Sequence, residues 1–406
     1  MILLENATFL DPVSGEARPG THVLIEGDTV REVSDRPLSS ASAERVDLGG
    51  RTLMPGLIDC HVHVVAAIVN LSQQAVLPDA LVAFRAAGIM RDMLMRGFTT
   101  VRDLAGATHA LRVAWEEGLY TGSRLNICGK ALSQTNGHGD GRGRYDTRHQ
   151  PRGLGALCRV ADGVDAVRRA CREELRHGAD YIKVMANGGV ASPTDPIAYL
   201  QYSEAELRAI VEEAEMAKTY VAAHLYTDEA IARAVRCGVL SLEHCNLIQP
   251  ETAKAAAKAG CIAVPTLVTY QALKEEGASL GLPPESVAKI DDVRLAGLRS
   301  LETMRDAGLT MAFGTDLLGA MHRRQSEEFS IRAEVLSPLE IIRSATTVAA
   351  RLLRMEGKIG VIAPGAWADM IVVDGDPLKD VRILARGGEV LPALIQAGRF
   401  VKRELH

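Results

Sequence analysis

The sequence predicts an α/β fold, a (β/α)8 barrel of the TIM type accompanied by a small β-sheet domain built from both chain ends. Two observations predict it. The middle of the chain alternates short apolar runs with amphipathic helical patterns, whereas both ends show only β-type alternation. At 406 residues the chain also exceeds the usual size of one compact domain, so we expect one large domain and a smaller one.

The two chain ends are expected to pair with each other. Their predicted strands include residues 23–26, 29–33, 370–375 and 393–401. Gly27 and Asp28 separate the first two, which is a hairpin signal. Because an unpaired strand edge invites association, we expect residues 1–56 and 361–406 to form one small domain.

Eight strands are expected in the larger domain, residues 57–360. They lie near residues 57–64, 98–104, 124–132, 181–186, 221–226, 240–245, 261–267 and 311–316. Helical patterns separate them: Ser203 and Glu206 form a capping-box signature, and another helix is expected between Thr227 and Gly238. Continuous apolar strands of this kind suit a parallel sheet buried on both faces.

A barrel places its active site at the carboxyl ends of the strands and in the loops that follow them. Three of the expected loops are long, at residues 133–160, 187–202 and 268–290. Long loops on such a scaffold usually bind ligands, although surface decoration is the alternative.

The composition argues against nucleic-acid and membrane partners. The net charge is only -5 and no long Lys/Arg run occurs, so neither nucleic acid nor an anionic membrane is indicated. No apolar stretch approaches a membrane span, and Glu5 interrupts the first apolar residues, so a cytoplasmic location is expected. The seven cysteines are odd in number and lack Cys-x-x-Cys spacing, which indicates reduced core thiols.

Polar side chains close five of the apolar runs. They are His61 and His63, Lys183, His224, His244 and Asp316. Alternate strand residues share a face, so His61 and His63 can converge on one ion. Each group alone is more often structural, but burying all of them without partners would cost several kcal/mol apiece. A metal centre at the barrel mouth would satisfy the whole set.

Lys183 is a special case among these groups. A protonated ammonium has no lone pair and cannot ligate a cation. Either Lys183 is not a ligand, or it is carbamylated by CO2 into an anionic group whose two oxygens can bridge two metals.

The order of these residues, with the Pro-Gly-Ala-Trp-Ala-Asp-Met-Ile-Val-Val segment at 364–373, resembles the amidohydrolase superfamily over essentially the full chain. The segments 183–189, 137–140 and 224–227 resemble its prolidase-like branch, which is related to imidazolonepropionase. The resemblance implies a split β-sandwich beside the barrel. It also implies cleavage of dipeptides or N-acyl amino acids next to a free carboxylate.

The resemblance further implies a dinuclear site, with zinc the expected metal. His61, His63 and Asp316 would hold the deeper ion, His224 and His244 the second, and carbamylated Lys183 would bridge both. Asp316 would carry the proton from the attacking water to the leaving nitrogen.

The residues expected to contact substrate are His138 and Tyr226. His138 would stabilise the oxyanion, unless it is a solvated loop histidine. Tyr226 would bind the substrate carboxylate, unless it is a structural phenol. An anion clamp by Arg142, Arg144 and Arg148 is less favoured than a solvated surface run.

We therefore expect a metal-dependent amidohydrolase that acts on small molecules, with Xaa-Pro dipeptides as first substrates, and we expect a homo-oligomer. An imidazolonepropionase-like cyclic amide hydrolase is the competing enzyme, but that relative lacks the bridging lysine, so Lys183 argues against it. A catalytically inactive scaffold is the alternative of another class. It is disfavoured because every ligand position is filled.

Overall fold

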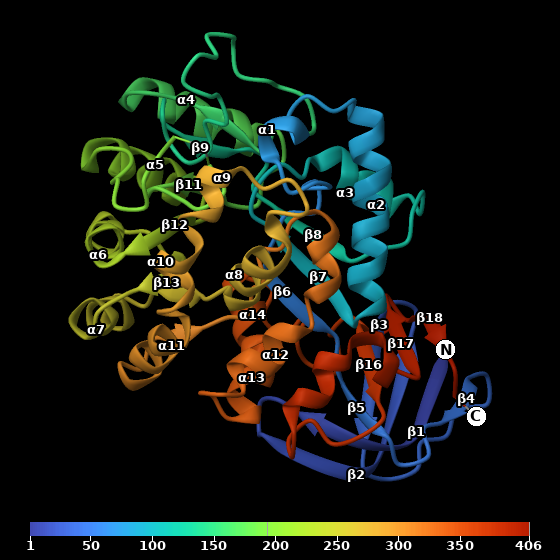
Figure 1. Ribbon diagram of the computed structural model, residues 1–406. Helices are drawn as coiled ribbons and strands as arrows, with labels where there is room; N and C mark the ends of the chain where they lie inside the picture. The colour runs from blue at the N-terminus through green and yellow to red at the C-terminus, as the bar shows by residue number, and fades with distance from the viewer. Residues whose placement is uncertain (193, 406) are drawn as a thin grey trace. The chain divides into compact units, whose positions relative to one another are not determined.

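The computed structural model describes residues 1–192 and 194–405, so Pro193 of the 187–202 loop lies outside the described residues. The chain divides into two compact units. The terminal unit comprises residues 1–60, 92–101 and 326–406, and the central unit comprises residues 61–91 and 102–325. Figure 1 labels the elements of both units.

The terminal unit contains an eight-stranded sheet with the order β18-β17-β16-β5-β1-β2-β3, and β4 also pairs with β1. Its strands are β1 (Ile2–Asp11), β2 (Glu16–Glu26), β3 (Thr29–Ser34), β4 (Glu44–Asp47), β5 (Thr52–Pro55), β16 (Met370–Val373), β17 (Ala393–Gln396) and β18 (Arg399–Arg403). Ile371 of β16 lies opposite Met54 of β5 in an antiparallel pair. The predicted pairing of the two chain ends is therefore confirmed, as is the hairpin at Gly27.

The central unit contains a parallel sheet of seven strands with the order β10-β9-β11-β12-β13-β14-β15. These strands are β9 (Ala131–Ser133), β10 (Cys158–Val160), β11 (Ile182–Met185), β12 (Val221–Thr227), β13 (Ser241–Leu247), β14 (Ile262–Val264) and β15 (Thr310–Met311). A three-stranded sheet joins β6 (Leu57–Val62), β7 (Phe98–Asp103) and β8 (Arg124–Ile127). The chain passes between the two units within β6 and within β7.

Each of the eight expected strands is present, but three differ from expectation. The third is divided into β8 and β9. The seventh stops at Val264 because Pro265 has no N–H to continue the ladder. The eighth is only two residues long, and Asp316 beyond it has a left-handed backbone (φ 55°) that regular strands exclude. The backbone N–H groups of Thr315 and Asp316 instead donate to the carbonyl of His61.

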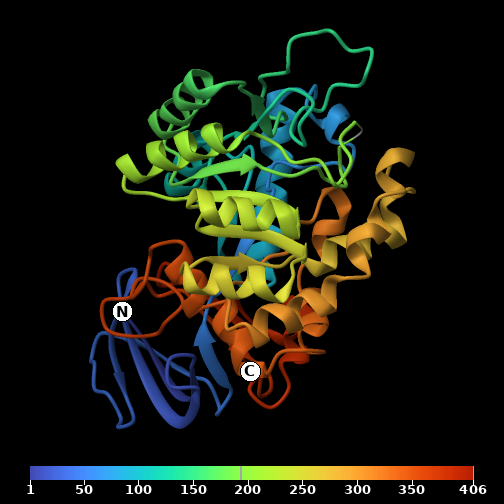
Figure 2. The same cartoon turned by 90° about the vertical axis from the view of Figure 1, so that its left-hand side faces the viewer.

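Helices connect the strands of the central unit. They are α1 (Leu71–Gln74), α2 (Asp79–Met95), α3 (His109–Glu116), α4 (Val164–Arg176), α5 (Glu204–Met216), α6 (Asp228–Cys237), α7 (Pro250–Lys258), α8 (Leu267–Ala272), α9 (Pro284–Val287), α10 (Ile290–Arg294) and α11 (Gly297–Asp306). Helices α4 to α7 lie side by side in chain order (Figures 1 and 2). The terminal unit adds α12 (Glu327–Arg332), α13 (Pro338–Ser344) and α14 (Thr347–Leu352).

Two predicted helix boundaries are confirmed. The N–H of Glu206 donates to Ser203 Oγ, and the Glu206 carboxylate accepts from the N–H of Ser203. Helix α6 begins after Thr227 and ends at Gly238, whose φ of 93° favours glycine. Across residues 1–192 and 194–405, no helix is both long enough and apolar enough to cross a membrane.

Candidate metal centre

The strand ends of the central unit deliver polar side chains to one pocket. It has a volume of about 60 Å³. The side chains are His61 of β6, His63 directly after β6, Lys183 of β11, His224 of β12, His244 of β13 and Asp316 after β15. The structure therefore brings all six predicted ligand residues together.

The Asp316 carboxylate is the meeting point of three imidazoles. Its Oδ1 lies 3.0 Å from Nε2 of His63 and 3.4 Å from Nε2 of His61, and its Oδ2 lies 4.0 Å from Nδ1 of His244. Ligand atoms of His61, His244 and Asp316 all lie within 4.8 Å of one another. Burial raises the pKa of Asp316, but the adjacent imidazoles outweigh burial and hold that pKa well below its usual value. An ionised carboxylate among imidazoles is a donor set that suits zinc.

One more imidazole, that of His224, adjoins this group through His244. His224 Nδ1 lies 2.9 Å from His244 Nε2, and the two ring centroids are 4.6 Å apart. Burial lowers the pKa of both residues well below the usual value, so both rings are neutral. Neutral imidazoles keep a lone pair for a metal.

Lys183 shares this buried environment. Its side chain is only 1% exposed and lines the same pocket. Burial lowers its pKa, while the carboxylates of Glu243 and Asp316 act in the opposite direction. An amine in this position lies among the predicted ligands rather than in solvent, so the lysine does not snorkel to the surface.

Left-handed backbone occurs at two of the predicted ligand residues. His244 has φ 68° and Asp316 has φ 55°, and Cys245 after His244 has φ 59°. Residues other than glycine seldom adopt this region, and such strain recurs at active sites, where the surrounding structure maintains it. At His244 it interrupts the alternation of β13. As a result, Glu243 reaches His61 while its neighbour His244 lines the pocket.

A buried ion pair between Glu243 and Arg102 contacts His61 at its Nδ1 atom. Glu243 Oε2 lies 2.8 Å from His61 Nδ1, and Arg102 donates to Glu243 Oε1 at 2.8 Å. All three side chains are buried. Burial raises the pKa of Glu243, but Arg102 and His61 outweigh burial, so the carboxylate stays ionised. A carboxylate on Nδ1 orients the ring and leaves Nε2 for a metal.

The sequence patterns assign no role to Glu243 or Arg102. A usable signal was nevertheless present, because each is a charged residue inside an apolar strand. A buried charge requires a partner, so an arginine in one strand and a glutamate in another predict an ion pair.

His138 comes from the long 133–160 loop and reaches the cluster. Its ring stacks on His224 with centroids 4.2 Å apart. Its Nδ1 lies 2.7 Å from Ser192 Oγ. Burial lowers the pKa of His138 to about 4, so the ring is neutral at ordinary pH. The side chain is 12% exposed, unlike a solvated loop histidine.

Tyr226 also lines the pocket, beside His224 at a ring distance of 4.7 Å. Its hydroxyl accepts a hydrogen bond from Tyr270 at 3.1 Å, a partner on α8 that the sequence reasoning did not identify. Asn187 holds the end of β12, because its Oδ1 accepts from the backbone N–H groups of Tyr226 and Thr227.

The three loop arginines do not line this pocket. Arg142 is paired with Asp140, Arg148 is paired with Asp146, and Arg144 is exposed. Arg142 and Arg148 border an adjoining pocket of about 120 Å³, which His138 also borders. The guanidinium groups of Arg142 and Arg148 are already paired with carboxylates. This pairing argues against a role for them in binding a substrate anion.

The chain is similar in sequence and in structure to known amidohydrolases. The chain matches the Amidohydrolase family over residues 52–401. Ochratoxinase from Aspergillus niger is 34% identical over 361 residues, which cover 85% of this chain and 74% of that protein. The crystal structure of a prolidase complexed with N-methylphosphonate-L-proline is 52% identical, with a TM-score of 0.97 and 99% of both chains covered. Another amidohydrolase crystal structure is 56% identical, with a TM-score of 0.98 over 100% of both chains.

The family is generally metal-dependent, and the pocket holds a possible metal site. The chain therefore belongs to the amidohydrolase family and is a prolidase-like hydrolase of amide C–N bonds.

Proposed function

We propose that this chain is a dinuclear metal-dependent amidohydrolase that cleaves an amide bond next to a free carboxylate. Xaa-Pro dipeptides are the first candidate substrates, and N-acyl amino acids are the wider class. The observation that carries the proposal is the convergence of six ligand-type side chains from five strand ends in one pocket. Similarity to a prolidase bound to a proline phosphonate and to an ochratoxinase supports the substrate class.

The donor set fits two divalent cations, and zinc is the proposed metal. His61, His63 and Asp316 would hold the deeper ion, since both imidazole Nε2 atoms approach one carboxylate oxygen. The second ion would take His224 and His244, and a carbamate on Lys183 would bridge the two ions. Bound divalent cations polarise an amide carbonyl and lower the pKa of a water molecule.

The residues of the chain supply the remaining chemistry. Asp316, ionised and beside His63, accepts the proton of the attacking water and returns it to the leaving nitrogen. His138 donates a hydrogen bond to the carbonyl oxygen as negative charge develops there. Tyr226 donates a hydrogen bond to the substrate carboxylate. Because its hydroxyl accepts from Tyr270, the hydrogen of that hydroxyl is directed to another acceptor.

The wider architecture belongs to the same proposal. The hydrogen bonds from Thr315 and Asp316 to His61 support closure of the eight strands into one barrel. We assign residues 57–360 to the barrel domain and residues 1–56 and 361–406 to a split β-sandwich. A homo-oligomer is part of the proposal, and so is a cytoplasmic location, which the burial of all seven cysteine thiols supports.

Hydrolysis assays test the function directly. Protein reconstituted with zinc and bicarbonate is given Xaa-Pro dipeptides, N-acyl amino acids and imidazolonepropionate side by side. We expect release of the carboxyl-terminal amino acid from the first two classes. Turnover of imidazolonepropionate alone would favour the competing cyclic amide hydrolase, and no turnover of any of the three classes would refute the proposal.

A further inference from the structure

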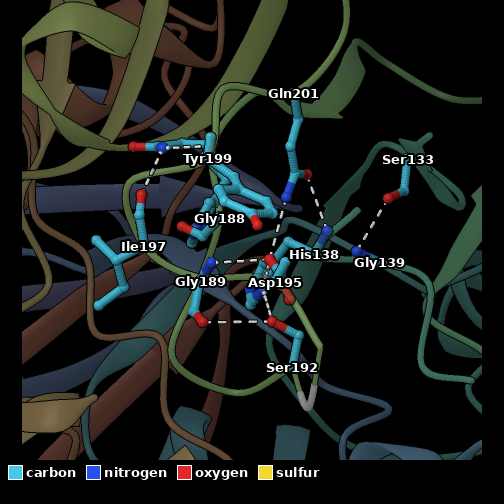
Figure 3. A network of polar contacts seen from close by, with 12 residues as sticks. Ser133, His138, Gly139, Gly188, Gly189, Ser192, Asp195, Ile197, Tyr199 and Gln201 are labelled. Carbon is cyan, nitrogen blue, oxygen red and sulfur yellow. Dashed lines mark hydrogen bonds and ion pairs between the residues drawn. The ribbon is translucent and has the colours of Figure 1, made fainter. Parts of the chain in front are cut away.

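The His138 ring packs against two neighbours. It stacks on His224, and it lies so close to Gly189 that a Cβ added there would be 2.0 Å from the ring Cε1. The backbone N–H of His138 donates to Gln201 Oε1 at 2.8 Å. The ring therefore cannot turn freely, and its Nδ1 is committed to the segment that carries Ser192 and Asp195 (Figure 3).

Within the described part of the chain, Nδ1 of His138 has one partner at hydrogen-bond distance, Ser192 Oγ at 2.7 Å. Asp195 Oδ2 is farther away, at 3.7 Å. That oxygen already accepts from the N–H of Gly189 and from the side-chain amide of Gln201, each at 3.0 Å (Figure 3). The hydroxyl, rather than the carboxylate, therefore determines which ring nitrogen carries the hydrogen.

The Ser192 hydroxyl has a single hydrogen and two acceptors in reach. One is His138 Nδ1 at 2.7 Å, and the other is the carbonyl of Gly189 at 3.3 Å. The shorter distance is the usual length of a bond donated by a hydroxyl group.

The carbonyl of Gly189 is already engaged by Lys289. The ammonium of Lys289 donates to the carbonyls of Gly189, Ser192 and Asp195, the last two at 2.8 and 3.1 Å. Lys289 therefore leaves the hydroxyl hydrogen of Ser192 free for His138.

We propose that Ser192, assisted by Lys289, is a positioning residue that holds His138 as the tautomer with its hydrogen on Nε2. When Nδ1 accepts a hydrogen bond, the neutral ring must carry its hydrogen on the other nitrogen. That nitrogen then donates to the substrate carbonyl oxygen. The consequence for catalysis rests on the proposed function, whereas the tautomer itself does not.

Nitrogen NMR of the zinc-loaded, ¹⁵N-histidine-labelled protein reads the tautomer, with His138→Gln used to assign the signals. We expect protonated Nε2 and unprotonated Nδ1 in the wild type. Ser192→Ala should raise the Nδ1-protonated fraction and lower kcat about 10-fold or more with little change in KM, because the donor to the oxyanion is lost. Ser192→Thr keeps the hydroxyl and should restore both readouts.

Two further variants separate positioning from a general loosening of the loop. Ser133→Ala removes the hydroxyl that accepts from the N–H of Gly139, so it loosens the loop and should leave the tautomer unchanged. Lys289→Met frees the Gly189 carbonyl to compete for the Ser192 hydrogen, so it should raise the Nδ1-protonated fraction.

A wild type protonated on Nδ1, or a Ser192→Ala tautomer identical to that of the wild type, would overturn the proposal. An unchanged tautomer in Lys289→Met would overturn the part assigned to Lys289. If the tautomer depends on Ser192 but no amide is hydrolysed, the proposed function fails and the positioning role stands. If amides are hydrolysed and Ser192→Ala has the tautomer and the kcat of the wild type, the positioning role fails and the proposed function stands.

Discussion

The pocket is built from two kinds of structure. Its strand-end side, with His61, His63, His224, His244 and Asp316, rests on parallel strands and on the buried Glu243–Arg102 pair. Its loop side carries His138, whose backbone N–H donates to Gln201 Oε1 and whose Nδ1 lies beside Ser192 Oγ. Groups on strands are fixed by a hydrogen-bonded ladder, whereas groups on loops depend on each individual contact.

This difference separates two tasks. Metal ligands must converge within a few ångströms, and strand ends provide that rigidity. A donor to the transition state must additionally be present in the right tautomer, which a hydroxyl and a competing carbonyl can determine locally. Changes on the strand-end side should therefore remove metal or chemistry, while changes on the loop side should reduce the rate of an intact centre.

The largest expected effect lies on the strand-end side. Asp316→Asn removes the proposed proton acceptor and should lower kcat by about 10³-fold. Steady-state kinetics with an Xaa-Pro dipeptide measure the loss, and circular dichroism checks the fold. Asp306→Asn, at an exposed aspartate paired with Arg305, is the matched control and should keep wild-type kcat. Equal activity of the two variants would contradict the role of Asp316.

A smaller effect is expected from Glu243, which contacts the predicted ligand His61 and the buried Arg102. Glu243→Gln leaves the buried Arg102 charge without its carboxylate partner, which should lower the free energy of unfolding by about 3 kcal/mol. It should also weaken metal binding by about 10-fold to 100-fold, because His61 loses its orienting partner. Denaturant unfolding and a metal titration measure the two changes. Glu251→Gln, at an exposed glutamate, is the control, and a Glu243→Gln variant as stable as this control would refute the supporting role.

The arginine loop provides the smallest expected effect. Arg148 is exposed and already paired with Asp146, so Arg148→Ala should change kcat/KM by no more than about twofold. Kinetics with an N-acyl amino acid test this expectation. A loss of tenfold or more, confined to KM, would instead establish an anion clamp and move part of substrate recognition to the loop.

The two sides also differed in how well the sequence predicted them. The strand-end residues could be predicted because each ends an apolar run, and a barrel brings such ends together. The contact of Glu243 with His61 was not predicted, because the left-handed backbone at His244 breaks the alternation by which strand faces are assigned. Ser192 and Lys289 escaped because loop contacts depend on packing that spacing does not encode.

The fold shows the same division. The hairpin at Gly27 and two helix caps followed from turn and capping residues, which act locally. The pairing of the chain ends followed from the need to cover strand edges. The third strand was predicted as one segment because apolar residues cluster on both sides of Gly129 and Lys130, where the structure divides it into β8 and β9. Strand β10 was missed because its three residues carry too little periodicity to stand out in a long loop.

Metal content decides whether the strand ends form a metal centre. Elemental analysis of wild-type protein reconstituted with zinc and bicarbonate should give about two ions per chain. The same measurement on Lys183→Ala, which lacks the bridging group, should give clearly fewer. Well under one ion per chain in the wild type, or equal contents in the two proteins, would contradict the dinuclear centre.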